Sequence, residues 1–139
     1  MNQRFPKEER LKSLKKIQFV INKGRVIRFG CIKVHWMILP VDQDADLTKT
    51  SFLKAGFSVP KKKIKRAYGR NQIRRKMKEI FRLNKKLLYE HIPDGKQLLL
   101  FIIYQSDQNI NYPTIEYNLV NALQRIQENL NREKKTNTK

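Results

Sequence analysis

The chain has 139 residues and a formal net charge of +19, from 31 lysine and arginine residues against 12 aspartate and glutamate residues. This length fits one domain with a hydrophobic core, and no apolar run approaches the roughly 18–20 residues that span a membrane. A single cysteine, Cys31, excludes an intrachain disulfide framework and a cysteine-based zinc site. The charged N-terminus lacks the apolar core of a secretory signal, so we expect a cytoplasmic protein. Its charge predicts a polyanionic partner, with nucleic acid ahead of a membrane surface.

The positive charge is concentrated in one segment. Residues 61–86 contain thirteen basic side chains against one acid, Glu79, whereas residues 29–60 contain three of each. Residues 1–28 form a second basic segment, with nine basic and two acidic side chains. A charge that only kept the protein soluble would be mixed in sign. Residues 61–86 are therefore predicted to form a contact surface.

The first predicted elements precede this segment. Apolar residues at helical spacing predict a short amphipathic helix over residues 8–22, which Gly24 stops. Alternation from Ile32 to Ile38 predicts a strand with one buried face that ends before Pro40.

A polar connection and a second strand follow. The connection over residues 42–49 has aspartates at the alternate spacing of a calcium loop, but leucines stand where such a loop needs glycine and glutamate. We therefore predict a turn at Asp42, Asp44 and Asp46. Residues 55–59 predict a short strand closed by Pro60.

The second half of the chain predicts two helices and an interior strand. The first helix begins at Arg66 or Arg70 and ends at Tyr89, before the turn residues 93–95. The uniformly apolar run within residues 97–104 predicts a strand covered on both faces. A further helix is expected to open near Pro113, a favourable first helical residue. Strands with helices before, between and after them predict one α+β domain.

The helix that ends at Tyr89 has an apolar side and a cationic side. At about 100° per residue, its apolar residues gather around Ile73, and they are Met77, Ile80, Phe81, Leu87 and Leu88. The next sector is basic, and it consists of Arg70, Arg74, Lys78, Arg82 and Lys85, with Arg75 just beyond it. Like charges at intervals of four residues repel each other unless an anion lies against them. Arginine can hold phosphate in a bidentate manner, and Asn71 offers a donor and an acceptor to a base edge or a ribose hydroxyl. The cationic side is predicted to dock on nucleic acid.

The motifs around this helix resemble those of the bacterial ribonuclease P protein subunit. Residues 56–62, Gly-Phe-Ser-Val-Pro-Lys-Lys, match a strand end of the form G-x-S-V-S-K-K, with Pro60 in place of the usual serine. Residues 70–82 match the helix that follows it in the family, which contains the sequence Arg-Asn-Arg. Gln72 stands where the family usually has the second of these arginines. The flanking elements fall in matching order, so the resemblance covers about residues 8–130.

The resemblance implies a fold and a function. The fold would be a two-layer α/β sandwich around a mixed sheet with a left-handed βαβ crossover, in one α+β domain over residues 1–130. The lysine- and asparagine-rich composition of residues 131–139 separately predicts a basic, disordered tail. The function would be that of a protein subunit, monomeric in a one-to-one complex with a large catalytic RNA, that assists removal of the 5′ leader from precursor tRNA. The RNA, with bound Mg²⁺, would carry out the phosphodiester hydrolysis.

The resemblance also implies two sets of contact residues. Those that would dock on the catalytic RNA are Arg66, Arg70, Asn71, Arg74, Arg75, Lys78 and Arg82. Those that would line a leader-binding cleft between the first helix and the sheet are Ile17, Ile21, Lys33, His35, Trp36, Lys61 and Lys62. A shift of one residue in strand register exchanges the two faces of the strand, so either Lys33 and His35 or Val34 and Trp36 face the leader. Trp36 accordingly either stacks on a base or belongs to the core, and His35 is expected to be an exposed strand residue.

The residues offer no catalytic set within the protein and no metal site. His35 and His91 lie far apart, and there is no glycine-rich phosphate loop. This fits a subunit whose partner RNA carries the catalysis. Two other classes stay open: a ribosomal or other structural RNA-binding protein, which shares the size and charge, and a DNA-binding regulator, which would need more base-reading side chains on its helix.

Overall fold

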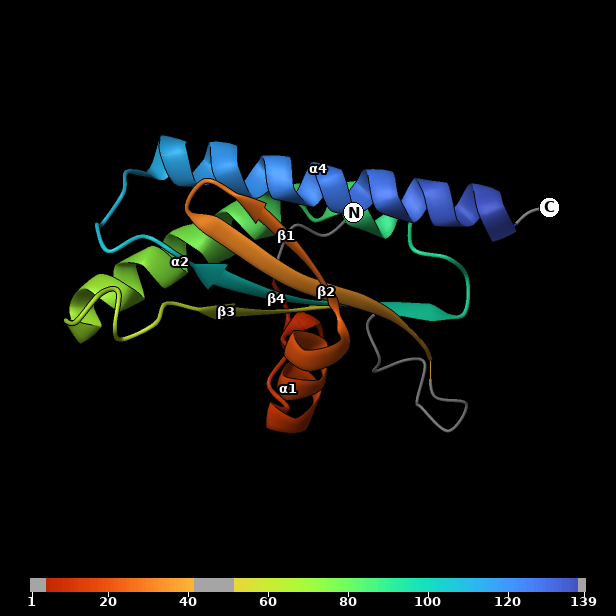
Figure 1. Ribbon diagram of the computed structural model, residues 1–139, viewed down its shortest axis with the longest axis horizontal. Coiled ribbons are helices and arrows are strands. Elements are labelled where there is room, and N and C mark those ends of the chain that lie inside the picture. The colour runs from red at the N-terminus through yellow and green to blue at the C-terminus, as the bar shows by residue number, and fades with distance from the viewer. Residues whose placement is uncertain (1–4, 42–51, 138–139) are drawn as a thin grey trace.

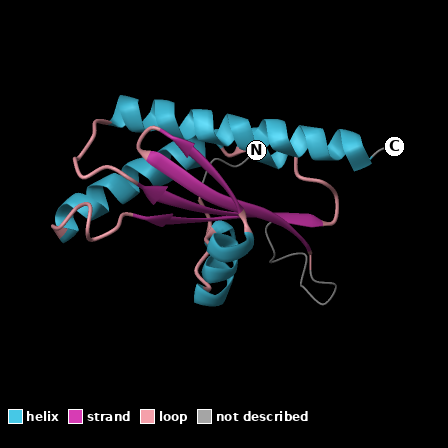
Figure 2. Cartoon of the chain, in the orientation of Figure 1, coloured by secondary structure: helices cyan, strands magenta, loops and turns pink. Residues whose placement is uncertain are grey.

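The computed structural model describes residues 5–41 and 52–137, and within them the chain forms four strands and four α-helices (Figures 1 and 2). The elements are the 3-10 turn η1 (Lys7–Glu9), α1 (Leu14–Lys23), β1 (Arg25–Phe29), β2 (Ile32–Pro40), β3 (Leu53–Ser58), α2 (Ala67–Asn84), α3 (Lys86–Tyr89), β4 (Lys96–Tyr104) and α4 (Tyr112–Asn137). The turn predicted at Asp42, Asp44 and Asp46 lies outside the described residues.

The four strands form one mixed sheet in the order β1-β2-β4-β3. The pairs β1–β2 and β2–β4 are antiparallel, whereas β3 and β4 are parallel and are connected through α2 and α3. Gly30, which has a φ of +58°, makes the tight turn between β1 and β2. All described strands belong to this one sheet, and the predicted single-domain α+β fold is confirmed.

Helices lie on both faces of the sheet. The long α4 and the helix α2 lie on one face, and α1 projects from the other (Figure 1). The main core between the sheet and α2 and α4 contains Ile32, Val34 and Trp36 of β2. A smaller core under α1 contains Val20, with Leu99 of β4. Because adjacent residues of β4 point into the two cores, β4 is covered on both faces, as its apolar run predicted.

Several elements differ from expectation. The strand β1 was not predicted, and the helix predicted to end at Tyr89 is divided into α2 and α3. The helix predicted over residues 8–22 begins only at Leu14. Ser13 caps it by accepting a hydrogen bond from the amide of Lys16. Leu11, which lies before this cap, instead donates its amide to the carbonyl of Ala55 in β3, at 2.9 Å. The prediction of a disordered tail from residue 131 is wrong as far as Asn137, because α4 continues to that residue. Adding residues to the end of a formed helix does not require a new nucleation step.

A buried ion pair fixes the N-terminal segment to the end of α2. Lys85 Nζ lies 2.6 Å from Glu9 Oε1, and both side chains are about 95% buried, with exposed fractions of 4% and 5%. The hydroxyl of Tyr89 donates to the other carboxylate oxygen. Lys85 is thus wrongly assigned to the cationic sector of the helix, because a carboxylate from 76 residues away neutralises it.

Candidate nucleic-acid interface

The helix α2 has the predicted buried stripe and a polar side. Ile73, Met77 and Ile80 are fully buried in the main core. On the polar side, the Arg74 guanidinium donates to Asn71 Oδ1 at 2.8 Å, and Arg75 and Lys78 are exposed, as are Asn71 and Arg66. The structure therefore gathers most of the predicted RNA-docking residues on or just before one helix.

Two arginines of the predicted set make additional contacts within the protein. Arg70 donates from Nη1 to the carbonyl oxygens of Ile64 and Lys65, at 3.0 and 2.7 Å, and so holds the loop that precedes α2. Arg82 donates to both carboxylate oxygens of Glu79, at 3.1 and 2.6 Å, and these hydrogen bonds lower the pKa of Glu79. The acceptors for Arg70 are neutral carbonyl groups, whereas the partner of Arg82 is a carboxylate that compensates its charge.

Cations from the N-terminal segment join this side of α2. Although Lys78 is exposed, partial loss of hydration beside the neighbouring side chains lowers the pKa of its ammonium, and the nearby charges of Arg74, Arg10 and Lys12 lower it further. We call Arg10, Lys12, Arg74 and Lys78 the cationic cluster. Sequence reasoning missed Arg10 and Lys12, although the positive balance of residues 1–28 marked their segment. The pairing of Leu11 with β3 brings them to α2.

The register of β2 is now clear. Val34 and Trp36 point into the main core, and Trp36 is only 1% exposed. Trp36 is therefore wrongly included among the cleft residues, because the main core buries its ring. Alternation along the strand places Lys33 and His35 on the opposite face, the side on which Met37 packs against α1.

His35 is buried rather than exposed as expected. Its exposed fraction is 5%, and among the described residues its Nδ1 atom has no hydrogen-bond partner. The reason is β1, which sequence reasoning missed: Val26 of β1 lies opposite His35 on one side, and Phe101 of β4 lies opposite it on the other. Burial lowers the pKa of His35, and the charges of Lys33 and Arg28 lower it further. The imidazole is therefore neutral at pH 7.

The side of the sheet that faces α1 also carries apolar and basic groups from other elements. Ile17 packs partly buried in the smaller core, and Ile21, one turn further along α1, is 37% exposed. Lys54 of β3 is paired in register with Leu99, and burial together with the charge of Lys16 lowers its pKa. We call the group of Ile17, Ile21, Lys33 and Lys54 the α1-side surface, from which the buried His35 is left out. Sequence reasoning missed Lys54.

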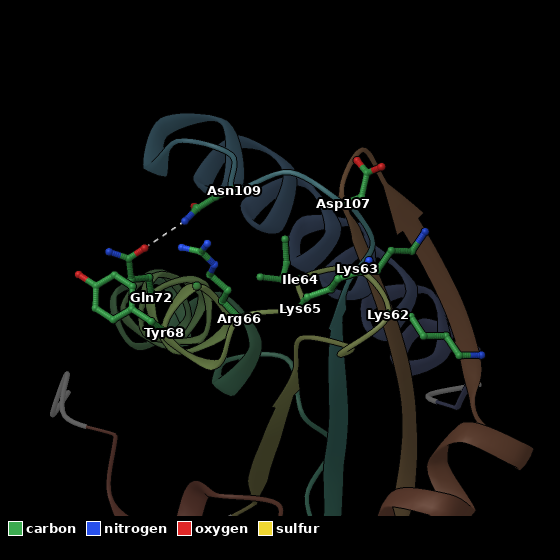
Figure 3. A pocket seen from close by; sticks show the side chains of 10 residues that line it. Lys62, Lys63, Ile64, Lys65, Arg66, Tyr68, Gln72, Asp107 and Asn109 are labelled. Atoms are coloured by element: carbon green, nitrogen blue, oxygen red, sulfur yellow. Dashed lines mark hydrogen bonds between the residues drawn. The ribbon is translucent and has the colours of Figure 1, made fainter.

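The other two predicted cleft residues, Lys61 and Lys62, are exposed in the turn after β3. Lys62 lines a depression of about 610 Å³ that lies at the start of α2 (Figure 3). The depression is lined by Lys62, Lys63, Ile64, Lys65, Arg66, Tyr68, Gly69, Gln72, Asp107 and Asn109. Arg66, which immediately precedes the predicted docking helix, thus also lines this depression.

Neither a metal cluster nor a membrane helix occurs in the described part of the chain. No group of three or more His, Cys, Asp or Glu side chains is placed to hold a metal ion there. Within the same residues, every helix is too short or too polar to cross a bilayer.

The mixed-sheet α+β fold and the cationic helix define a small, strongly basic protein whose charge favours a polyanionic partner. A family model described as Ribonuclease P matches residues 5–127. The chain therefore belongs to the ribonuclease P protein family, which confirms the resemblance of its motifs. This family supplies subunits of a tRNA-processing endoribonuclease.

Solved structures of this family share the fold. The RNase P protein of Staphylococcus aureus has a TM-score of 0.65 at 19% identity, over 85% of this chain and 94% of that chain. The RNase P protein of Thermotoga maritima, solved with 1-(4-fluorophenyl)-2-thiourea, has a TM-score of 0.64 at 21% identity, over 84% of this chain and 98% of that chain. A comparison with curated protein sequences gave no match.

Proposed function

We propose that this chain is the protein subunit of ribonuclease P, which binds the catalytic RNA and the 5′ leader of precursor tRNA and assists endonucleolytic removal of the leader. The observation that carries the proposal is the cationic cluster. Three positive side chains from two separate segments, Arg74, Arg10 and Lys12, lie close enough to Lys78 to lower the pKa of its ammonium, while the nearby acid Glu79 is bound to Arg82. Like charges held together in this way favour a polyanion, because each neutralised phosphate also releases counterions.

The side chains of α2 suit an RNA backbone. The hydrogen bond from Arg74 to Asn71 orients the guanidinium and leaves further N–H groups for a phosphate. Asn71 retains its amide donors for a ribose hydroxyl or a base edge. The docking set comprises Arg66, Arg70, Asn71, Arg74, Arg75, Lys78 and Arg82, with Arg10 and Lys12 added, and Arg82 would exchange Glu79 for phosphate.

The leader would lie on the α1-side surface. Lys33 and Lys54 supply charge for its phosphates, and Ile17 and Ile21 supply apolar contact. Lys61 and Lys62 would continue this path beyond the end of β3. A surface that combines cations with apolar contacts suits a single strand without fixing its sequence.

The RNA would carry out the hydrolysis, with Mg²⁺ bound mainly by the RNA. Mg²⁺ prefers oxygen ligands such as phosphates and keeps several of its waters, so a folded RNA supplies the donors it needs. The protein would act by positioning the substrate and by neutralising phosphate charge. It would work in the cytoplasm, as one protein copy with one catalytic RNA and a precursor tRNA.

Reconstitution tests the proposal. The protein is mixed with a bacterial ribonuclease P RNA and a 5′-labelled precursor tRNA at low Mg²⁺, and leader release is followed over time. We expect the protein to increase the cleavage rate, and the double variant Arg74→Ala/Lys78→Ala to lose most of this effect. The control Lys86→Ala/Arg125→Ala removes the same charge from exposed positions elsewhere and should retain it.

A second substrate separates leader binding from RNA docking. A precursor with a shortened leader should gain less from the protein, while the affinity for mature tRNA stays nearly unchanged. Tight RNA binding without any stimulation would instead indicate a structural RNA-binding protein and would overturn the proposal.

A further inference from the structure

The depression at the start of α2 lies on the opposite flank of that helix from the cationic cluster. At about 100° per residue, Gln72 and Arg74 stand on either side of the buried Ile73. Tyr68, Gln72 and Lys76 follow at intervals of four residues and therefore form one row. This row faces the loop between β4 and α4, because Gln72 and Lys76 both contact Asn109. Contacts made in the depression are therefore separate from those of the cationic cluster.

A chain of hydrogen bonds sets the direction of the amide groups in the depression. The Lys76 ammonium can only donate, and it lies 3.1 Å from the Asn109 side-chain oxygen and 3.3 Å from the carbonyl of Ile110. The amide nitrogen of Asn109 must then face Gln72, and it donates to Gln72 Oε1 at 3.1 Å. Figure 3 shows this pair at one end of the depression.

The amide nitrogen of Gln72 is left available by this arrangement. Since Oε1 of Gln72 is held by Asn109, Nε2 presents its two N–H groups away from that contact, and it has no hydrogen-bond partner among the described residues. An N–H pair of this kind can donate to a carbonyl oxygen or ring nitrogen of a nucleobase. Tyr68, one helical turn earlier, is 74% exposed and offers its ring for stacking.

The rest of the depression is strongly positive. Lys62, Lys63, Lys65 and Arg66 line it against one acid, Asp107. Figure 3 shows Tyr68 and Gln72 at one end and Lys62, Lys63 and Asp107 at the other. A stacking ring and a directed amide therefore share one hollow with several phosphate-binding cations. Its volume of about 610 Å³ falls within the ~300–1,000 Å³ range of small-ligand pockets.

We propose that this depression binds one unpaired nucleotide of an RNA, with its base stacked on Tyr68 and hydrogen-bonded by Gln72, and its flanking phosphates held by Arg66 and the loop lysines. The inference rests on the proposed function in that it takes RNA as the partner. It adds a base-binding site to a protein whose other proposed RNA contacts are mainly to phosphate. An acidic peptide would satisfy the lysines, but it would not account for an exposed ring beside a directed amide.

Nuclear magnetic resonance on the full-length, nitrogen-15-labelled chain tests the proposal. The probes are a uridine pentanucleotide and an abasic pentamer with the same number of phosphates. Both should shift the backbone resonances of residues 62–66, but only the uridine oligomer should shift the Gln72 side-chain amide. That resonance is assigned by its loss in the variant Gln72→Met.

Affinities measured in the same titrations supply the second readout. Replacing an aromatic platform by alanine costs stacking of ~1–3 kcal/mol per base, so Tyr68→Ala should weaken binding of the uridine oligomer about 5- to 150-fold. Tyr68→Phe keeps the ring and should bind nearly normally. The matched control is Tyr117→Ala, because Tyr117 is also exposed, at 63%, but lies on α4 outside the depression. It should leave the affinity unchanged.

Several outcomes would overturn the inference. Equal shifts and affinities for the abasic and uridine oligomers would show that the depression binds only phosphate. An unaltered affinity of Tyr68→Ala for the uridine oligomer would show that no base stacks on Tyr68. Tighter binding of a glutamate peptide of the same charge would favour a protein partner. None of these results depends on cleavage, so they are distinguishable from failure of the proposed function. With catalytic RNA, Tyr68→Ala removes no charge and should leave the salt dependence of binding unchanged, unlike Arg74→Ala/Lys78→Ala.

Discussion

The buried pair of Glu9 and Lys85 should be essential for stability. The substitution Glu9→Gln preserves the shape of the side chain but leaves the Lys85 charge without its carboxylate, although that ammonium is only 4% exposed. Removing one partner of a buried ion pair typically costs ~3–5 kcal/mol, because the remaining charge stays out of water. Since whole domains are stable by only ~5–15 kcal/mol, Glu9→Gln should remove a large fraction of the free energy of unfolding.

Urea denaturation of four proteins measures this effect. They are the natural chain, Glu9→Gln, Lys85→Met and the double variant Glu9→Gln/Lys85→Met. The double variant buries no unpaired charge, so it should be more stable than the sum of the single effects predicts. Glu90→Gln is the control, because it breaks the exposed pair of Lys86 and Glu90, at 3.7 Å, and should cost at most ~1 kcal/mol. A loss below ~1 kcal/mol in Glu9→Gln, or strict additivity in the double variant, would refute the reasoning.

The same pair should influence RNA binding. Glu9 precedes Arg10 directly, and Arg10 and Lys12 belong to the cationic cluster around Lys78. If the N-terminal segment detaches in Glu9→Gln, these two cations leave the cluster. At temperatures where the variant is still folded, the salt dependence of its binding to catalytic RNA should therefore be weaker than that of the natural chain. An unchanged dependence would show that the segment stays in place without the pair.

Three further predictions concern the interface and the sheet. In Arg74→Ala/Lys78→Ala, the slope of log K against log salt for RNA binding should fall by ~0.7–0.9 for each phosphate that the protein no longer neutralises, as measured by filter binding. Burial lowers the pKa of His35 below the ordinary value of 6.5. As the pH falls through that value, the unfolded chain binds more protons than the folded chain, and the free energy of unfolding therefore decreases. Urea titrations at pH 7 and pH 5 should show a smaller decrease in His35→Gln than in the natural chain. Gly24→Ala should lower the melting temperature, because its Cβ would lie 2.4 Å from the carbonyl oxygen of Val20, which as backbone cannot move aside at low cost.

The elements that could be predicted are those whose pattern is set by burial alone. The strand β4 was evident because a strand covered on both faces must be apolar throughout, and Leu98 and Leu99 indeed enter different cores. The inner stripe of α2 followed from helical spacing around Ile73. The strand β1 was missed because it lies at the edge of the sheet, where Arg25 and Arg28 are exposed and leave no simple alternation.

Errors in the candidate site followed from that missing strand and from long-range contacts. Without β1, nothing indicated that both sides of His35 would be covered, so it was expected to be exposed. The roles of Lys85 and Arg70 depend on partners that spacing along a helix does not reveal. Glu9 is 76 residues from Lys85 in the sequence, and the acceptors for Arg70 are backbone carbonyls of the loop before the helix.

The buried ion pair also helps to hold the cationic cluster together. A cluster of like charges tends to separate, and Arg10 and Lys12 stand on a segment that is not part of any long helix or strand. The attraction between Glu9, the residue next to Arg10, and Lys85 opposes that separation. Burial keeps this attraction strong because little water screens it. The hydrogen bond from Leu11 to Ala55 holds the other end of the segment on the sheet. The repulsion within the cluster is thereby kept in the folded protein, where a phosphate backbone can relieve it.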